Sequence, residues 1–304
     1  MDIGICLPQS GDTAPSAVAS FAIAAERAGF GSLWAADRIL APLAPRMPYP
    51  ASADGELPSW MSNVADPLIE LAAAATVTST IRLGTSVLVA PWYPPLLLAR
   101  SSTTLDRLSA GRFTLGLGVG WSVDEFDALG TPFTNRGARM EEILDVLDAV
   151  WNDDAVSITT TREHIAPSTV GLKPTRGRIP VSMAAFTPAG LDRIARRADG
   201  WNVAGIPVEI AATMWRDVLA AAERAGRNPA EMRLIIRAIV HLVGELPEGR
   251  PDFTGSLQQV RDDINRCMAS GADEVFLDLH NCTTDADQML ALASEIAERA
   301  LTSA

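Results

Sequence analysis

The order of strand-like and helix-like segments constrains the fold of this chain more than any other feature. Short β-branched or apolar runs alternate with longer segments of helical periodicity, which is the pattern of βαβ units in a parallel sheet. Eight such units favour a closed (β/α)8 TIM barrel, formed by residues 1–304 as a single domain. The predicted strands are Asp2–Leu7, Ser32–Ala35, Ile81–Val87, Arg112–Leu117, Pro180–Ala184, Gly200–Val203, Met232–Val240 and Glu274–Leu279.

Two intervening segments have the apolar stripe of a helix that packs on a barrel. In Arg139–Trp151, apolar residues recur at helical spacing, and the acidic residues lie largely on the opposite side. The segment Asp287–Leu301 repeats this pattern near the end of the chain. We therefore expect the second helix to cover the last strand of the barrel.

Two connections are longer than ordinary turns. Arg38–Val64 follows the second predicted strand, and Asp153–Ile179 precedes the fifth. Loops that follow barrel strands lie at the C-terminal face, where TIM-barrel enzymes build their active sites. The first insertion is therefore a candidate substrate lid, although a plain surface loop would fit the sequence equally well.

Charge and cysteine content narrow the classes of partner. A net charge of −12 disfavours binding to nucleic acids or to anionic membranes, which would repel this chain. The three cysteines have neither disulfide nor metal-ligand spacing, so no metal is expected and a reducing cytoplasm fits. No apolar stretch is long enough to cross a bilayer, and the first residues are typical of a strand and not of a signal peptide. These features favour a cytoplasmic protein that binds neither nucleic acid nor a membrane.

Contiguous motifs around the third and fourth predicted strands resemble those of a known superfamily. The runs are Ile81–Pro91, Leu105–Ser109 and Leu115–Trp121, with further matches at Trp34–Asp37 and Ala198–Trp201. Together they resemble the luciferase-like flavin and deazaflavin enzymes over most of the chain. The resemblance implies an oxidoreductase, a TIM barrel and a homodimer.

The run Thr85-Ser86-Val87-Leu88 is similar to the deazaflavin-dependent sugar-phosphate dehydrogenases of that superfamily. This similarity implies coenzyme F420 and hydride transfer to or from a small organic substrate. Trp60, Trp92 and Trp121 fall on loops after predicted strands and could wall an apolar pocket, which suits an enone, imine or ketone. An FMN-dependent monooxygenase and a non-catalytic flavin-binding or deazaflavin-binding protein are the alternatives.

The resemblance also implies where the coenzyme ring lies. In the relatives a non-prolyl cis peptide ends the third strand and supports the ring, and the matching bond here joins Ser86 to Val87, next to Thr85. Asp37 matches a residue near the polar part of the ring, although alone it would be read as a turn cap. The sugar-phosphate branch has a His and a Glu where this chain has Arg38 and Trp121. Sugar-phosphate oxidation is therefore not expected.

Two further segments are candidate coenzyme contacts. The glycine-rich run that contains Gly118, Val119 and Gly120 could allow close backbone approach to the ring or tail, since glycine has no Cβ. A helix is predicted to begin after the fifth strand, and its free N–H groups could bind the coenzyme phosphate. A simple Thr cap followed by Pro is the alternative interpretation. The residues of this segment are Ala184, Ala185, Phe186 and Thr187.

His280 is the preferred titratable candidate for catalysis. It follows the eighth predicted strand and should therefore lie at the catalytic face, whereas His241 and His164 have no clear role. Imidazole exchanges protons near neutral pH, which suits a general acid or base. Arg38 and Trp121 complete the set of predicted catalytic residues, and a hydrogen-bonded structural imidazole is the alternative for His280.

Overall fold

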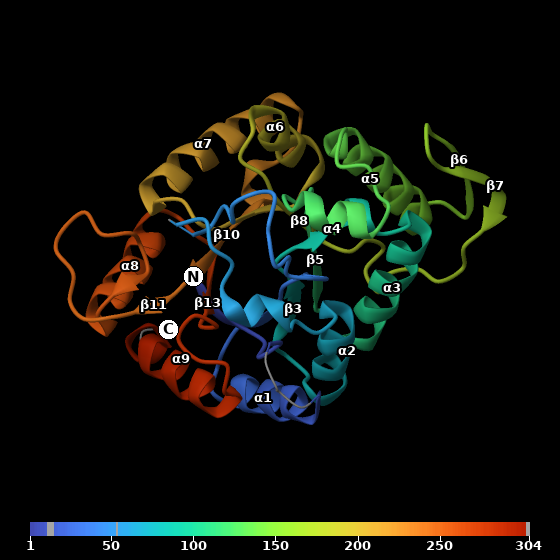
Figure 1. The fold of residues 1–304 in the computed structure, drawn as a ribbon. Helices are drawn as coiled ribbons and strands as arrows, with labels where there is room; N and C mark the ends of the chain where they lie inside the picture. The colour runs from blue at the N-terminus through green and yellow to red at the C-terminus, as the bar shows by residue number, and fades with distance from the viewer. Residues whose placement is uncertain (11–14, 53, 302–304) are drawn as a thin grey trace.

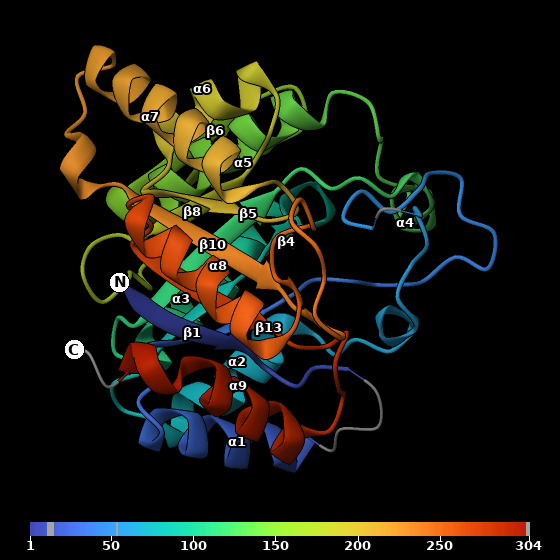
Figure 2. The same ribbon diagram turned by 90° about the vertical axis from the view of Figure 1, so that its left-hand side faces the viewer.

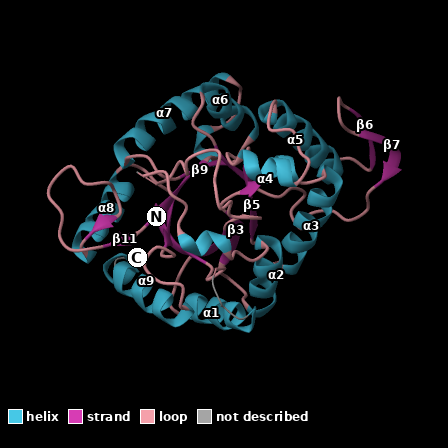
Figure 3. Ribbon diagram, viewed as in Figure 1, coloured by secondary structure: helices cyan, strands magenta, loops and turns pink. Residues whose placement is uncertain are grey.

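Eight parallel strands close into a barrel in the computed structural model, which describes residues 1–10, 15–52 and 54–301. Strand order is β1-β2-β3-β5-β8-β9-β10-β13, and β13 pairs with β1 to close the ring. Figure 3 shows this ring of strands inside a ring of helices. The predicted (β/α)8 TIM barrel is therefore confirmed. The barrel strands are β1 (Asp2–Cys6), β2 (Ser32–Ala35), β3 (Arg82–Thr85), β5 (Phe113–Gly118), β8 (Val181–Ala184), β9 (Gly200–Val203), β10 (Arg233–Ile239) and β13 (Glu274–Asp278).

Helices alternate with the strands and cover the outside of the barrel (Figure 1). The two helices expected from apolar periodicity are α5 and α9, and α9 contacts β1 at the closure of the ring. Their apolar faces are buried, as the sequence pattern requires. The helices are α1 (Pro15–Arg27), α2 (Pro67–Val77), α3 (Pro95–Leu108), α4 (Val123–Ala128), α5 (Arg136–Asn152), α6 (Pro188–Arg197), α7 (Val208–Arg224), α8 (Leu257–Ala269) and α9 (Ala286–Leu301).

All eight predicted strands are present, but the third is interrupted. Strand β3 ends at Thr85, and a short strand β4 (Leu88–Val89) follows it and pairs with β5. The peptide bond between Ser86 and Val87 is cis, as the resemblance implied. This bond lies at the C-terminal end of the barrel, where the candidate site was expected.

The first insertion lies across the C-terminal end of the barrel, as expected for a lid. Figure 2 shows the segment after β2 and helix α4 projecting beyond this end. The insertion includes a short 3-10 helix, η1 (Ser59–Ser62). Gln9 joins its two ends, because its side-chain amide donates to the carbonyls of Ala36 and Ala65 at 3.1 and 3.3 Å. Gln9 therefore fixes both ends of the lid.

The second insertion is a two-stranded hairpin, β6 (Ala155–Thr159) and β7 (His164–Thr169). It protrudes from the outside of the helical ring, beside α5 (Figure 1). His164, the first residue of β7, is exposed on this hairpin. The hairpin therefore contributes nothing to the candidate site.

Side chains fill the N-terminal half of the barrel. Buried Glu274 accepts hydrogen bonds from Ser32, from the Trp34 indole and from Arg82. The Trp34 ring occupies the space beside Gly84, where a Cβ would lie 2.3 Å from it. TIM barrels are packed in this way and not hollow, so ligands bind at the C-terminal ends of the strands.

Within the described ranges, no helix combines the length and the apolar character that crossing a membrane requires.

Candidate functional site

Buried polar groups from three strands meet at Ser86, directly after β3. The Ser86 hydroxyl donates to Asn202 Oδ1 on β9 at 3.1 Å. The Arg237 guanidinium, from β10, donates to the Ser86 carbonyl at 2.8 Å. Ser86 and Asn202 are almost fully buried, and no described residue provides a partner for Asn202 Nδ2. Buried amide groups normally have partners, so this atom indicates a ligand position.

Arg237 forms a buried ion pair with Asp278, at the end of β13. The two side chains approach to 2.6 Å, and both are largely removed from solvent. Burial acts to raise the pKa of Asp278, but the Arg237 charge and the bond to His280 outweigh it and hold that pKa well below its usual range. Asp278 is therefore a fixed negative charge at neutral pH.

His280 extends this charge network towards the lid. Its Nδ1 lies 2.7 Å from Asp278 Oδ1, and because a carboxylate only accepts, Nδ1 carries the proton. The residue is 4% exposed, and no described residue lies within hydrogen-bonding distance of Nε2. The Trp60 ring, from the lid, stacks on the imidazole with centroids 4.6 Å apart. The structure therefore places His280 at the mouth with one ring nitrogen available.

Asp37 lies at the mouth after β2, the strand that pairs with β3. Its Oδ2 accepts hydrogen bonds from the Val89 backbone N–H and from the Tyr93 hydroxyl, both at 3.0 Å. Burial raises the pKa of Asp37 to about 6, although these two bonds oppose the shift. Asp37 is thus held close to the residues that follow the cis bond.

Arg38 and Trp121 form a second cluster, which fastens the lid to helix α4. The Arg38 guanidinium lies 4.9 Å from the centre of the Trp121 ring and 3.5 Å from Glu125. Tyr49, further along the lid, packs against Trp121 at 5.5 Å. Burial lowers the pKa of Arg38. This geometry gives both predicted catalytic residues a clear role in lid anchoring, while their contact with substrate stays a prediction.

In the structure the glycine-rich run packs against the residues at and after the end of β3, whereas it was expected to allow close approach of a coenzyme. A Cβ on Gly116 would lie 1.7 Å from the Thr85 carbonyl oxygen, and one on Gly118 would lie 2.6 Å from the Val87 side chain. Gly120 has a φ of +73° and faces the side chain of Val89. These glycines make room for the segment after β3. Contact of Gly118, Val119 and Gly120 with a coenzyme remains a prediction.

Helix α6 begins where the phosphate site was predicted. Thr187 is its cap, since the hydroxyl accepts from Gly190 N at 3.2 Å, and Pro188 follows. The cap interpretation is therefore confirmed. The half-exposed ring of Phe186 lies beside this helix end, and the Ala185 carbonyl accepts from the Trp201 indole. Phosphate binding by Ala184, Ala185, Phe186 and Thr187 stays a prediction.

Cys6 joins Asp278 and His280 in a trio whose potential ligand atoms lie within 4.8 Å of one another. Arg237 already neutralises Asp278, and its own positive charge opposes a metal ion. Burial also raises the pKa of the Cys6 thiol well above its usual value, whereas metals bind the thiolate. The trio therefore does not resemble a metal site.

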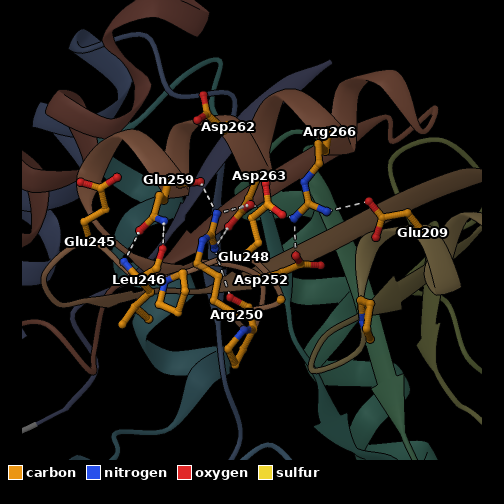
Figure 4. A pocket seen from close by; sticks show the side chains of 14 residues that line it. Glu209, Glu245, Leu246, Glu248, Arg250, Asp252, Gln259, Asp262, Asp263 and Arg266 are labelled. Carbon is orange, nitrogen blue, oxygen red and sulfur yellow. Dashed lines mark hydrogen bonds and ion pairs between the residues drawn. The ribbon is translucent and has the colours of Figure 1, made fainter.

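A cavity of about 830 Å³ lies elsewhere, between helix α8 and the loop 245–252. Figure 4 shows that carboxylates dominate its lining. Its two guanidinium groups are already paired, Arg250 with Asp263, and Arg266 with Asp252 and Asp263. An acidic wall without a free cation would repel a phosphate-bearing coenzyme, so the mouth of the barrel is the better candidate site.

Three polar residues of the mouth were missed from the sequence: Asn202, Arg237 and Asp278. Arg237 interrupts the apolar run Leu234–Ile239, and Asp278 ends a buried strand. Charged residues are rarely buried unless they are paired. A charged residue inside a predicted core strand could therefore have identified Arg237 and Asp278 as candidates for a buried polar site.

Comparisons with known proteins agree with this architecture. A family model described as luciferase-like monooxygenase matches residues 1–247. An uncharacterized protein of Mycobacterium tuberculosis is 35% identical over 207 residues, which are 66% of this chain and 73% of that protein. The F420-dependent glucose-6-phosphate dehydrogenase of Kineococcus radiotolerans is 31% identical over 192 residues, or 62% of this chain and 52% of that enzyme.

Two solved structures share the fold at low identity. A monooxygenase from Streptomyces bottropensis matches with a TM-score of 0.80 and 20% identity over 99% of both chains. An F420-dependent secondary alcohol dehydrogenase matches with a TM-score of 0.77 and 16% identity over 97% of both chains. At these sequence identities the two comparisons show a shared fold and not a shared activity.

Proposed function

This chain belongs to the luciferase-like monooxygenase family, and we propose that it is an oxidoreductase that transfers a hydride between coenzyme F420 and a small organic substrate. The observation that carries the proposal is the buried polar set at the mouth of the barrel. Asn202 and Arg237 hold Ser86 from two strands, and Asn202 Nδ2 and His280 Nε2 have no partner among the described residues. Buried polar atoms normally have partners, so this pair supports a ligand between β9 and the end of β13.

The residues of the mouth fit a deazaflavin. Thr85, Ser86 and Val87 would support one face of its ring, with Asp37 and Asn202 near its polar edge. The start of α6, with Thr187, would bind the phosphate through free N–H groups. When bound, the coenzyme supplies two-electron hydride chemistry. The protein would orient the reactants and exclude water from them, and the lid would contribute to excluding water.

Two findings favour F420 over FMN. The run Thr85-Ser86-Val87-Leu88 is similar to the deazaflavin-dependent branch. The Kineococcus enzyme, whose name states F420 dependence, is 31% identical to this chain. A 4-hydroxyprotoasukamycin monooxygenase is 26% identical, which keeps an FMN-dependent monooxygenase as the second candidate.

A binding titration tests the coenzyme. Purified protein is titrated separately with F420 and with FMN, and binding is followed by coenzyme fluorescence. We expect saturable binding of one F420 per chain, with affinity at least about tenfold above that for FMN. Asn202→Leu should weaken F420 binding, because it removes the amide at Ser86. Tight FMN binding without F420 binding would overturn the choice of coenzyme.

We also propose that the protein is a homodimer that pairs through helices α2 and α3. Helix α2 is apolar on nearly all sides, and Ile69 on its outer face is 70% exposed. Ile69 borders a groove of about 320 Å³ that Ala72, Leu105 and Leu108 also line. An apolar patch on an outer barrel helix suits a subunit interface, and a two-fold axis would place each Ile69 against the partner's groove.

Size-exclusion chromatography with light scattering tests this interface. We expect the wild-type protein to be a dimer and Ile69→Asp to be largely monomeric, because the carboxylate would be desolvated against Leu105 and Leu108 at the interface. Ile210→Asp is the matched control, since Ile210 on α7 is also exposed, at 51%, but lies away from the groove. A monomeric wild-type protein, or a dimer unaffected by Ile69→Asp, would contradict the interface.

A further inference from the structure

We propose that His280 Nε2 transfers the proton that accompanies the hydride, and that the substrate pair is a carbonyl compound and its alcohol. This inference rests on the proposed function and deepens it. The proton donor would lie after the eighth strand of the barrel. The sugar-phosphate branch has a histidine after its second strand, where this chain has Arg38.

The hydrogen bonds of the imidazole leave Nε2 as the reactive nitrogen. Nδ1–H is engaged by Asp278 Oδ1 at 2.7 Å, and the other carboxylate oxygen is held by Arg237 at 2.6 Å. Asp278 therefore stays charged, fixes the ring orientation and stabilises the imidazolium form. Nε2 points away from this pair, is buried and has no partner among the described residues. It can exchange a proton only with a group that enters the mouth.

The charges around the ring are balanced before a substrate binds. Asp278 and Arg237 form one pair, and the Cys6 thiol beside them is neutral because burial raises its pKa. From the lid, the Trp60 ring covers one face of the imidazole, and the Trp60 indole donates to Asn281. While the ring is neutral, such a site accepts a neutral substrate more readily than an ion, since an added charge would be buried without a partner.

The unpartnered atoms of the mouth indicate which neutral group is bound. His280 Nε2 is a donor when the ring is protonated, whereas Asn202 lies at Ser86, where the polar edge of the coenzyme is proposed to bind. A carbonyl oxygen has lone pairs and can accept from Nε2. A protonated imine has no lone pair, and a simple alkene offers no acceptor. This donor therefore favours a carbonyl group, in a ketone, an aldehyde or an enone, over a protonated imine or a simple alkene.

The reaction balances with the reduced deazaflavin as the two-electron hydride donor. In reduction, a C–H bond of the reduced deazaflavin would break, and its electron pair would form the new C–H bond at the carbonyl carbon. The C=O π electrons form an O–H bond with the Nε2 proton. The Nε2–H bond breaks, and its electron pair stays on nitrogen. Water then reprotonates the neutral imidazole. Alcohol oxidation follows the same steps in reverse, with neutral His280 as the base.

Turnover of the holoenzyme tests the role of His280. Protein loaded with reduced F420 is mixed anaerobically with cyclohexanone, 2-cyclohexenone or 1-pyrroline, and products and oxidised coenzyme are measured. We expect carbonyl reduction, and a fall in kcat of about 100-fold or more in His280→Gln. His164→Gln, on the outer hairpin, is the control and should retain wild-type turnover. Reduction only of the alkene or imine, no turnover of any probe, or an unchanged His280→Gln would overturn the proposal.

Tryptophan fluorescence provides a readout that needs no turnover. Because the Trp60 and His280 rings are stacked, protonation of the imidazole places a cation against the indole and should quench its emission. We expect a pH-dependent emission step that is lost in His280→Gln, reduced in Trp60→Phe and retained in His164→Gln. A pH response that survives His280→Gln would overturn proton exchange at this ring.

Failure of this inference can be separated from failure of the coenzyme assignment. His280→Gln should still bind F420 in the fluorescence titration, because the proposed ring contacts lie at Ser86 and Val87. Retained binding with unchanged turnover would reject the role of His280 alone. Loss of F420 binding by the wild-type protein would reject the proposed function itself.

Discussion

Replacing Gly116 with alanine is expected to destabilise the barrel by about 3 kcal/mol or more. A Cβ at this position would lie 1.7 Å from the Thr85 carbonyl oxygen, which belongs to the backbone and cannot rotate away. Thr85 is also held against Gly116 by two hydrogen bonds, because its hydroxyl donates to the Gly116 carbonyl at 2.9 Å and accepts from Gly116 N at 2.8 Å. Strands β3 and β5 would have to separate where β3 ends.

Urea denaturation followed by circular dichroism measures this loss. Gly244→Ala is the matched control, since a Cβ on Gly244 would meet no neighbouring atom within 4 Å and the residue lies on an exposed loop. The control should be neutral or stabilise the protein by up to about 1 kcal/mol, because alanine restricts the unfolded chain. Equal stability of the Gly116→Ala and Gly244→Ala proteins would show that the two strands are not packed as described.

Replacing Arg237 with methionine is expected to destabilise the protein by about 3 kcal/mol at pH 7.5. Methionine fills much of the same volume but leaves the fully buried Asp278 carboxylate with His280 as its remaining partner. The bond from Arg237 to the Ser86 carbonyl is lost as well. A buried charge that loses its counter-ion costs far more than an exposed pair would.

The pH dependence of this loss has a definite sign. In the wild-type protein the pKa of Asp278 is held below its unfolded value of about 3.9, so its contribution to stability is present above that pH and is lost in acid. Without Arg237, burial raises the pKa of Asp278, and the variant should recover relative stability as the pH falls from 7.5 to 5. Urea midpoints at both pH values measure this. A loss that is equal at both values would contradict a buried unpaired carboxylate.

Much of the fold followed from local sequence patterns. Each of the eight predicted strands is present, because runs of β-branched residues between helical segments are a local signal. The insertion after β2 was recognised by its length. The hairpin β6–β7 was not expected, because its strands are mostly exposed and lack the apolar alternation that marks a strand.

The site was harder to predict, because its interactions connect distant parts of the chain. Arg237 lies 151 residues from Ser86 and 41 residues from Asp278, so no local pattern joins them. His280 was found because it follows a predicted strand, and position after a barrel strand is a local property. The glycines were noticed, but their packing against Thr85 and Val87 depends on the register of two strands, which the sequence alone does not give.

The crystal structure of the protein grown with F420 tests the central claim most directly. We expect one face of the deazaflavin ring against Ser86 and Val87, its polar edge near Asn202, and its other face open towards His280. A ring bound elsewhere, or a ring covered by protein on both faces, would contradict hydride transfer at this site.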